Sequence, residues 1–304
     1  MLKLGRIEGK YLKFKDFFEE SLGSYLSEQC KESDLSSIFD YSLIDAGKRF
    51  RPVLSLSFAE VLGIPSQKII RFCIAVELLH NSSLIHDDLP ALDDDSIRRG
   101  KDTVHVSFGE ANAVLAADAL ISMAFKCLSE AEEVSSEVIV YWVRELSEAF
   151  TKLCHGQSLD ISEMNSIDDS KNFPQFEIEK RIEKRHKLKT GALIKSCVVA
   201  PAILYNSDLY SSEQKLEPFS QFAENLGLLF QITDDIEDAL ELKGHLDEHN
   251  EQATYVSLYG VDGAREKAFD VADEAIKILK TLGDENAYDV SFLISLTEAI
   301  RDRA

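Results

Sequence analysis

Five aspartates lie within nine residues in the segment HDDLPALDDD, which ends at Asp95. Carboxylates at this density repel one another, so the segment needs cations close by. Pro90 lacks a backbone donor and disfavours helical geometry at the residue before it, which predicts a bend after Asp87 and Asp88 that brings Asp93 back beside them. Oxygen ligands that converge in this way suit a hard cation such as Mg²⁺.

A second acidic cluster follows an apolar helical stretch in the segment QITDDIED. Asp234 and Asp238 are four residues apart and project from one helical face, which also carries Gln231; Asp235 is their neighbour. Magnesium commonly joins one or two carboxylates to phosphate oxygens, whereas the spacing of an EF-hand loop or of a zinc site is missing here. One such cluster in an acidic chain is most often solvated surface, but two of them favour a metal-dependent site.

Cations gather near these carboxylates although the chain is short of them. The motif AGKRFRP places three beside an expected helix start, where free N–H groups favour an anion. The motif RRGK directly follows the first acidic cluster. Each basic group alone is usually a solvated surface, but together they predict a cradle for diphosphate. The candidate cations are Lys48, Arg49, Arg51, Arg98, Arg99 and Lys101.

Two further side chains could reach a substrate. His80 is seven residues before Asp87 and so on the same helical face, where it could donate a hydrogen bond to a phosphate oxygen. Lys189 lies in the motif KTG, at the expected end of a strongly charged helix that begins at Phe176. The plainer alternatives are a structural histidine and a solvated helix terminus.

Composition excludes several classes of protein. The 54 acidic and 33 basic residues give a net charge of −21, which repels nucleic acid, so we expect no nucleic-acid partner. The five cysteines form no CxxC pair, and the first residues lack the apolar region of a signal peptide. The most apolar stretches, 111–125 and 193–205, are short and each carries a charge. We therefore expect a cytoplasmic protein without stable membrane insertion.

The elements that must position these residues are helices. Six prolines and 14 glycines punctuate the chain, and no run of alternating apolar and β-branched residues is present. Apolar residues recur every three or four positions from Val114 to Leu128 and from Phe222 to Phe230, which predicts buried helical faces. We predict an all-α fold and a single domain over residues 1–304.

The motifs AGKRFRP, LIHDDLPALDDDSIRRG, FGEANAVLAADAL, HGQSLD, LKTGAL and LLFQITDDIED, in this order, resemble those of the trans-polyprenyl diphosphate synthases. The resemblance implies a helical bundle around a deep apolar cavity, a homodimer, and two aspartate clusters that face each other across the cavity mouth. It also implies a transferase that joins an allylic diphosphate to isopentenyl diphosphate with several Mg²⁺ ions.

The resemblance assigns roles to individual residues. Magnesium would be bound by Asp87, Asp88, Asp93, Asp234, Asp235 and Asp238. The expected catalytic group consists of the first five of these aspartates and Lys189. The allylic diphosphate would contact Lys189, Thr190, Gln231 and Arg98. Isopentenyl diphosphate would be held by Lys48, Arg49, His80 and Arg99.

Product length can be argued from Ser82 and Ser83, five and four residues before Asp87. They lie about one helical turn, roughly 5 Å, deeper along the implied cavity wall. Family members that stop at fifteen carbons usually place an aromatic there. The serines therefore favour geranylgeranyl diphosphate, with twenty carbons, and leave farnesyl diphosphate as the alternative.

Two other functions remain open at this point. A terpene cyclase would share the first aspartate cluster but not the second, nor the basic pairs for a second diphosphate. A non-catalytic partner subunit of a synthase is favoured by a short loop after Asp238 and by Gln252, which stands where the family commonly has a lysine. Lys243 could replace that cation. The intact aspartate clusters argue against a subunit freed from catalysis.

Overall fold

The computed structural model describes residues 4–30, 34–44, 46–164, 173–209, 213–241 and 253–304. Almost all the described secondary structure is helical, which confirms the all-α prediction; a two-stranded antiparallel hairpin pairs Ile97 with Asp102. The elements are η1 (Gly5–Ile7), α1 (Glu8–Gln29), α2 (Ser36–Leu43), α3 (Phe50–Val61), α4 (Ser66–Asp87), β1 (Ile97–Arg98), β2 (Lys101–Asp102), α5 (Val104–Phe108), α6 (Glu110–Ser129), α7 (Ser136–Met164), α9 (Gln175–His186), η2 (Lys187–Gly191), α10 (Ala192–Tyr205), η3 (Ser207–Leu209), α11 (Glu213–Glu241), α12 (Tyr255–Asn286) and α13 (Ser291–Arg301).

The chain divides into two compact units. The first unit comprises Gly9–Leu146 and Ala200–Ser207, and contains the first aspartate cluster. The second unit comprises Met1–Glu8, Ser147–Val199 and Asp208–Ala304, and contains the second cluster. The predictions of a single domain and of a deep apolar cavity remain predictions.

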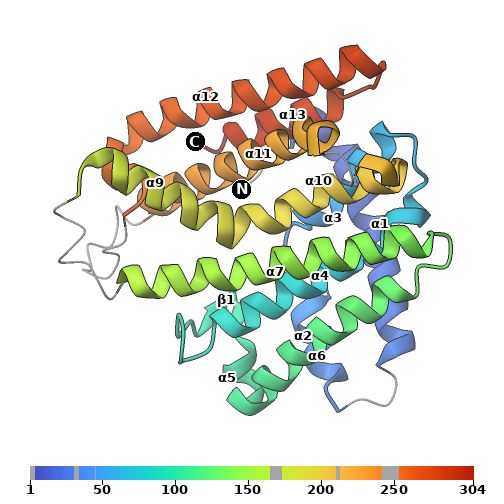
Figure 1. Ribbon diagram of the computed structural model, residues 1–304. Helices are drawn as coiled ribbons and strands as arrows, with labels where there is room; N and C mark the ends of the chain where they lie inside the picture. Colours follow the sequence, from blue (N-terminus) through green and yellow to red (C-terminus); the bar gives the residue numbers. More distant parts are fainter. Residues whose placement is uncertain (1–3, 31–33, 45, 165–172, 210–212, 242–252) are drawn as a thin grey trace. The chain divides into compact units, whose positions relative to one another are not determined.

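Helix α4 is the central element of the first unit. Every residue from Phe72 to Leu79 is buried, as expected for a helix that is covered on all sides. Helix α6 packs along it, and the two run side by side in Figure 1. Trp142 is fully buried beside Phe72, at 5.5 Å between ring centroids, and its indole N–H donates to the Ala200 carbonyl at 3.1 Å. Nearer the acidic cluster, the Ser82 hydroxyl of α4 donates to the Ala117 carbonyl of α6 at 2.9 Å.

Helix α11 has the corresponding place in the second unit. It packs against α12, α13 and η2, and Figure 1 shows α12 and α13 beside it. Its apolar residues Phe222, Leu226 and Leu229 are buried and Phe230 is half-buried, which agrees with the predicted helical face. The face predicted from Val114 is wrong at its first residue, because Val114 on α6 is 40% exposed. Helix α12 kinks at Gly260, whose φ of 71° is a conformation that glycine adopts without a steric penalty.

Two close approaches determine the course of the chain around Lys189. A Cβ on Gly156 of α7 would lie 2.5 Å from the Lys189 amide nitrogen, and one on Gly227 of α11 would lie 3.1 Å from Cα of Gly191. Gly156 therefore needs a residue without a side chain, whereas a Cβ at Gly227 would make a tight contact that a small shift could relieve. The chain from Lys187 to Gly191 forms a turn of π-helix between α9 and α10. Lys189 thus lies within a continuous helical path, not at the helix end that the sequence predicted.

Two of the described helices are long and apolar enough to cross a membrane by length and composition alone. They are Glu110–Ser129 and the continuous helical stretch Gln175–Tyr205, of which the apolar windows are 39% and 61% buried within the protein. Core helices of globular proteins pass the same test, so this observation is weak evidence for a membrane span.

Candidate functional site

The first aspartate cluster lies at the end of α4 and in the turn that follows it. The Asp88 N–H still donates to the carbonyl of Leu84 at 3.1 Å, so the helical path ends there. The chain then turns at Pro90, and the Asp93 N–H donates to the Asp87 carbonyl at 2.9 Å. This backbone bond confirms the predicted bend and returns the chain to the helix end.

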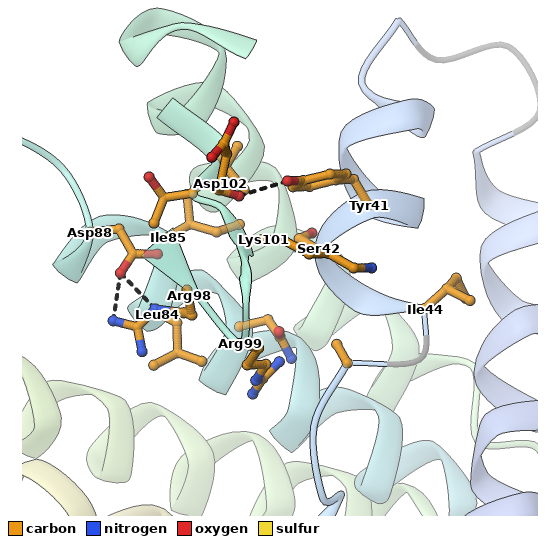
Figure 2. A pocket seen from close by; sticks show the side chains of 14 residues that line it. Tyr41, Ser42, Ile44, Leu84, Ile85, Asp88, Arg98, Arg99, Lys101 and Asp102 are labelled. Carbon is orange, nitrogen blue, oxygen red and sulfur yellow. Dashed lines mark hydrogen bonds and ion pairs between the residues drawn. The ribbon is translucent and has the colours of Figure 1, made fainter. Parts of the chain in front are cut away.

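Asp88 is buried and bonded to a cation from the hairpin. Nε of Arg98 donates to its carboxylate at 2.6 Å, and Nη2 of the same guanidinium lies 3.4 Å from Asp95. Burial raises the pKa of Asp88, and the bond to Arg98 opposes that rise. Figure 2 shows Arg98 directed at Asp88 from β1. The predicted neighbourhood of the first cluster and the RRGK cations is therefore present.

The turn of the β1–β2 hairpin carries Arg99. Its φ is 55° and that of Gly100 is 75°, so the tight turn is formed by two residues in the left-handed region. The Arg99 guanidinium lies against Gly47, where an added Cβ would be 2.9 Å from Cζ of the arginine. Glycine in the AGKRFRP motif thus leaves room for the cation of the RRGK motif.

His80 lies on α4 among these arginines. Desolvation lowers the pKa of its imidazole well below the usual value, and the charges of Arg51, Arg99, Arg98 and Arg49 lower it further. The ring is therefore neutral near neutral pH and can both donate and accept a hydrogen bond. The positive potential that disfavours a charged His80 also favours a bound anion.

Arg49 differs from its prediction. Its side chain is fully buried; Nε donates to Glu19 at 2.7 Å, Nη1 donates to Glu77 at 2.9 Å, and Nη2 donates to the Leu43 carbonyl. A buried charge persists only where partners replace its hydration, and these three acceptors do so. The assignment of Arg49 to isopentenyl diphosphate is therefore not supported, because all its donor nitrogens face partners within the protein.

The other two cations of the same motif are placed differently. Lys48 is exposed, and its backbone carbonyl accepts the hydroxyl of Tyr11 at 2.8 Å. Arg51 is half-buried, and among the nearby charges it lowers the pKa of His80 the most. The sequence assignment left Arg51 out of the substrate contacts, because three cations in one short motif cannot be told apart without their directions.

A pocket opens beside this cluster in the first unit. Its walls include apolar side chains of Leu84, Ile85 and Val104, and its polar lining includes Asp88 and Arg99. Figure 2 shows Leu84, Ile85, Asp88 and Arg99 around a common space between α2, α4 and the hairpin. An apolar wall beside a charged lining suits a ligand with a charged head and a hydrocarbon part.

In the second unit, Asp234 is paired with an arginine that follows α13. Arg303, of which the side chain is 3% exposed, donates to the Asp234 carboxylate and to Glu237 at 2.7 Å. Burial raises the pKa of Asp234, and the charge of Arg303 opposes that rise. The sequence did not indicate this partner, because it lies 69 residues away.

Asp235 lies on a different side of α11. Its carboxylate accepts the N–H of Tyr255 at 3.1 Å and lies 3.8 Å from Nε2 of the buried His186. Burial raises the pKa of Asp235 to about 6. Asp238, in contrast, is exposed.

Lys189 is held by a carboxylate that the sequence assignment missed. Its Nζ donates to Oδ2 of Asp160 at 2.5 Å, and Nε of Arg185 lies 3.4 Å from Oδ1 of the same residue. Asp160 is the last residue of the HGQSLD motif. The motif therefore points to this residue, but the sequence alone does not show that its carboxylate contacts Lys189. Thr190 is the next residue of the same π turn. Gln231 lies on α11, and its side chain opposes the fall in the pKa of His186 that burial causes.

The donor chemistry of both clusters fits magnesium. Within the described part of the chain, no three His, Cys, Asp or Glu side chains form a ready metal-binding group. The predicted ligands are nevertheless all carboxylates, and magnesium fills the rest of its octahedron with water and phosphate oxygens. Magnesium binding at these carboxylates remains a prediction. Gln252 and Lys243 lie outside the described residues.

Comparison with known proteins identifies relatives along most of the chain. A sequence model described as polyprenyl synthetase matches residues 32–287. Farnesyl diphosphate synthase of Escherichia coli (strain K12) is 38% identical over 273 residues, which are 86% of this chain and 87% of that protein. Geranylgeranyl diphosphate synthase of Cyanophora paradoxa is 34% identical over 269 residues, with 84% and 86% covered.

Solved structures agree with these sequence matches. A geranyltransferase from Legionella pneumophila superposes with a TM-score of 0.83 at 28% identity, covering 98% of this chain and 97% of the other. An FPP/GFPP synthase from Zymomonas mobilis gives 0.80 at 29% identity, with 97% and 98% covered.

The buried position of Arg49 predicts a loss of stability rather than a defect confined to substrate binding. Replacement Arg49→Leu leaves Glu19 and Glu77 without their partner and should lower the free energy of unfolding by about 3–5 kcal/mol. Lys10→Leu is the control, because Lys10 pairs with Glu60 in solvent. This replacement should lower the free energy of unfolding by less than about 1 kcal/mol. Urea unfolding measures both, and equal losses would contradict a structural role for Arg49.

Proposed function

Because the chain belongs to the polyprenyl synthetase family, we propose that it condenses an allylic diphosphate with isopentenyl diphosphate to give a linear prenyl diphosphate. The chain is a prenyltransferase by this membership. The observation that supports the specific reaction best is the end of α4. There, Asp87 and Asp88 adjoin Arg98, Arg99 and a neutral His80, a combination suited to a diphosphate with its metal.

The two diphosphates would be bound by different groups. We assign isopentenyl diphosphate to Lys48, His80 and Arg99, as predicted, and add Arg51, which replaces Arg49. The allylic diphosphate is assigned to Arg98, Lys189, Thr190 and Gln231. Magnesium is assigned to Asp87, Asp88 and Asp93 and to the face of α11 that carries Asp234 and Asp238.

The reaction requires stabilisation of a leaving group rather than a protein nucleophile. Cleavage of the allylic carbon–oxygen bond leaves a carbocation and a diphosphate, and the isopentenyl double bond then attacks the cation. Bound magnesium would supply positive charge to the departing diphosphate. Lys189, which pairs with Asp160, and Arg98, which pairs with Asp88, would add positive charge beside the departing diphosphate. Loss of a proton, which the departed diphosphate could accept, completes the product.

The proposed activity can be tested with labelled isopentenyl diphosphate and, separately, dimethylallyl, geranyl or farnesyl diphosphate. We expect linear products that form only with Mg²⁺, identified by chromatography after dephosphorylation. Lys189→Ala should lower turnover about a hundredfold, because it removes a preorganised cation. Lys187→Ala is the matched control in the same π turn, since that lysine is exposed and pairs with Glu224.

No elongation from any primer would overturn the proposed reaction. The alternative of a non-catalytic partner subunit would then come first. The sequence features that favour the alternative, Gln252 and its loop, lie outside the described residues.

We propose geranylgeranyl diphosphate as the product, with farnesyl diphosphate as the alternative. The proposal depends on the small side chains of Ser82 and Ser83. Both are buried: the Ser82 hydroxyl donates to the Ala117 carbonyl of α6 at 2.9 Å, and that of Ser83 donates to the His80 carbonyl at 2.8 Å. The relatives include synthases named for each product, so their names do not choose between them.

Ser82→Phe tests whether this position limits the product. A phenyl ring one turn beyond Asp87 should shift the product from twenty to fifteen carbons, measured by chromatography. Ser82→Ala, which removes only the hydroxyl, should leave the distribution unchanged. A thermal melt shows whether the phenylalanine variant folds, and Ser83→Phe offers a second site if it does not. A folded variant with an unchanged product would refute this assignment.

We also propose a homodimer in the cytoplasm. Helices α5 and α6 leave Val106, Val114 and Leu115 exposed at 48%, 40% and 58%, and a second copy could cover such apolar side chains. Light scattering at about twice the 34.1 kDa chain mass would agree with this assembly, and the monomer mass would exclude it.

A further inference from the structure

The end of α11 carries carboxylates on two different sides of the helix. Asp234 and Asp238 are four residues apart and share a face, whereas Asp235 is rotated by about 100° from Asp234. Asp238 is exposed, but the side chain of Asp235 is only 12% exposed. Asp235 therefore points into the protein, away from the face assigned to magnesium.

The partner of Asp235 is the beginning of α12. Its carboxylate accepts the N–H of Tyr255, the first residue of that helix, at 3.1 Å. The side chain of the N-cap Thr254 accepts the N–H of Ser257 at 3.1 Å, so each cap serves a different donor. The first N–H groups of a helix have no partner within it, and the helix dipole favours an anion there. The α12 start thus supplies the positive partial charge that a buried carboxylate needs.

Arg185 holds the same segment from its other side. Its guanidinium donates to the Ala253 carbonyl at 2.7 Å, and its side chain is 4% exposed. The Tyr255 ring is fully buried and stacks on His186, with 6.1 Å between centroids and 17° between planes. Arg185 and Asp235 therefore form hydrogen bonds with the backbone of Ala253 and Tyr255, the residues on both sides of Thr254.

These two hydrogen bonds are connected to Lys189. Nε of Arg185 lies 3.4 Å from one carboxylate oxygen of Asp160, and the other oxygen accepts Nζ of Lys189 at 2.5 Å. A continuous set of polar contacts therefore joins the α12 start to the lysine assigned to the allylic diphosphate. A change in the position of the segment would reach Lys189 through Arg185 and Asp160.

We propose that Asp235 is a positioning residue and not a magnesium ligand: with Arg185 it clamps Ala253 and Tyr255, and the clamp orients Lys189 through Asp160. The inference rests on the proposed function, because it concerns which carboxylates of that site hold the metal. It divides the second aspartate cluster into a metal face, Asp234 and Asp238, and a structural carboxylate between them.

Metal binding separates the two roles. Mn²⁺ is titrated into the full chain with inorganic diphosphate, and free Mn²⁺ is measured by electron paramagnetic resonance against a titration of diphosphate alone. Asp235→Asn should bind Mn²⁺ within about twofold of the parent, whereas Asp234→Asn, the matched control, should lose at least about tenfold in affinity. Equal losses in the two variants would overturn the proposal.

Hydrogen exchange tests the clamp itself. Asp235→Ala removes the acceptor of the Tyr255 N–H, so peptides containing this amide should exchange about tenfold faster. Asp235→Asn should restore most of the protection, because an amide oxygen accepts the same bond. Unchanged protection in Asp235→Ala would refute the clamp. Both measurements are made without substrate, so they judge the clamp even if the parent protein elongates no primer.

Discussion

Concentrated negative charge is the constraint on which the rest of this structure depends. A chain with a net charge of −21 buries Asp88 and Asp160 and half-buries Asp234 and Asp235 near helix ends, and each needs a positive partner where solvation is poor. Arg98 pairs with Asp88 and Arg303 with Asp234, whereas Asp235 accepts an N–H from the start of α12. Asp160 is likewise paired with Lys189, so each of these four carboxylates has a positive or partly positive partner.

The cations themselves depend on unusual backbone. Arg99 sits in the left-handed region beside a Gly47 that leaves room for its guanidinium, and Lys189 lies in a π turn pressed against Gly156. Such geometry costs free energy and persists where the surrounding packing over-determines it. Around Lys189 this packing is supplied by α7 and α11, and around Arg99 by the chain at Gly47. Cores built of ordinary apolar helices thus hold the charged side chains at their ends.

The sequence predicted the helical class, the bend after Asp88 and the neighbourhood of the two charged motifs because these follow from local patterns. Proline limits the backbone at one residue, and helical periodicity sets a buried face. The sequence could not predict that Arg49 is buried or that Arg303 reaches Asp234. Both depend on the direction of a side chain and on residues distant in sequence, and one cation in a motif looks like another until its partners are known.

The internal ion pairs also affect the free energy of metal binding in this protein. Asp88 and Asp234 already interact with arginines, so a divalent cation that binds them must replace or share these contacts. The net free energy of binding is then the difference between two cation–carboxylate interactions, each reduced by its own desolvation. If magnesium binds these carboxylates as proposed, a diphosphate that arrives with it would shift this balance, because a displaced guanidinium would gain a new anionic partner. Under that proposal, the arginines that now pair with the carboxylates would couple metal binding to substrate binding.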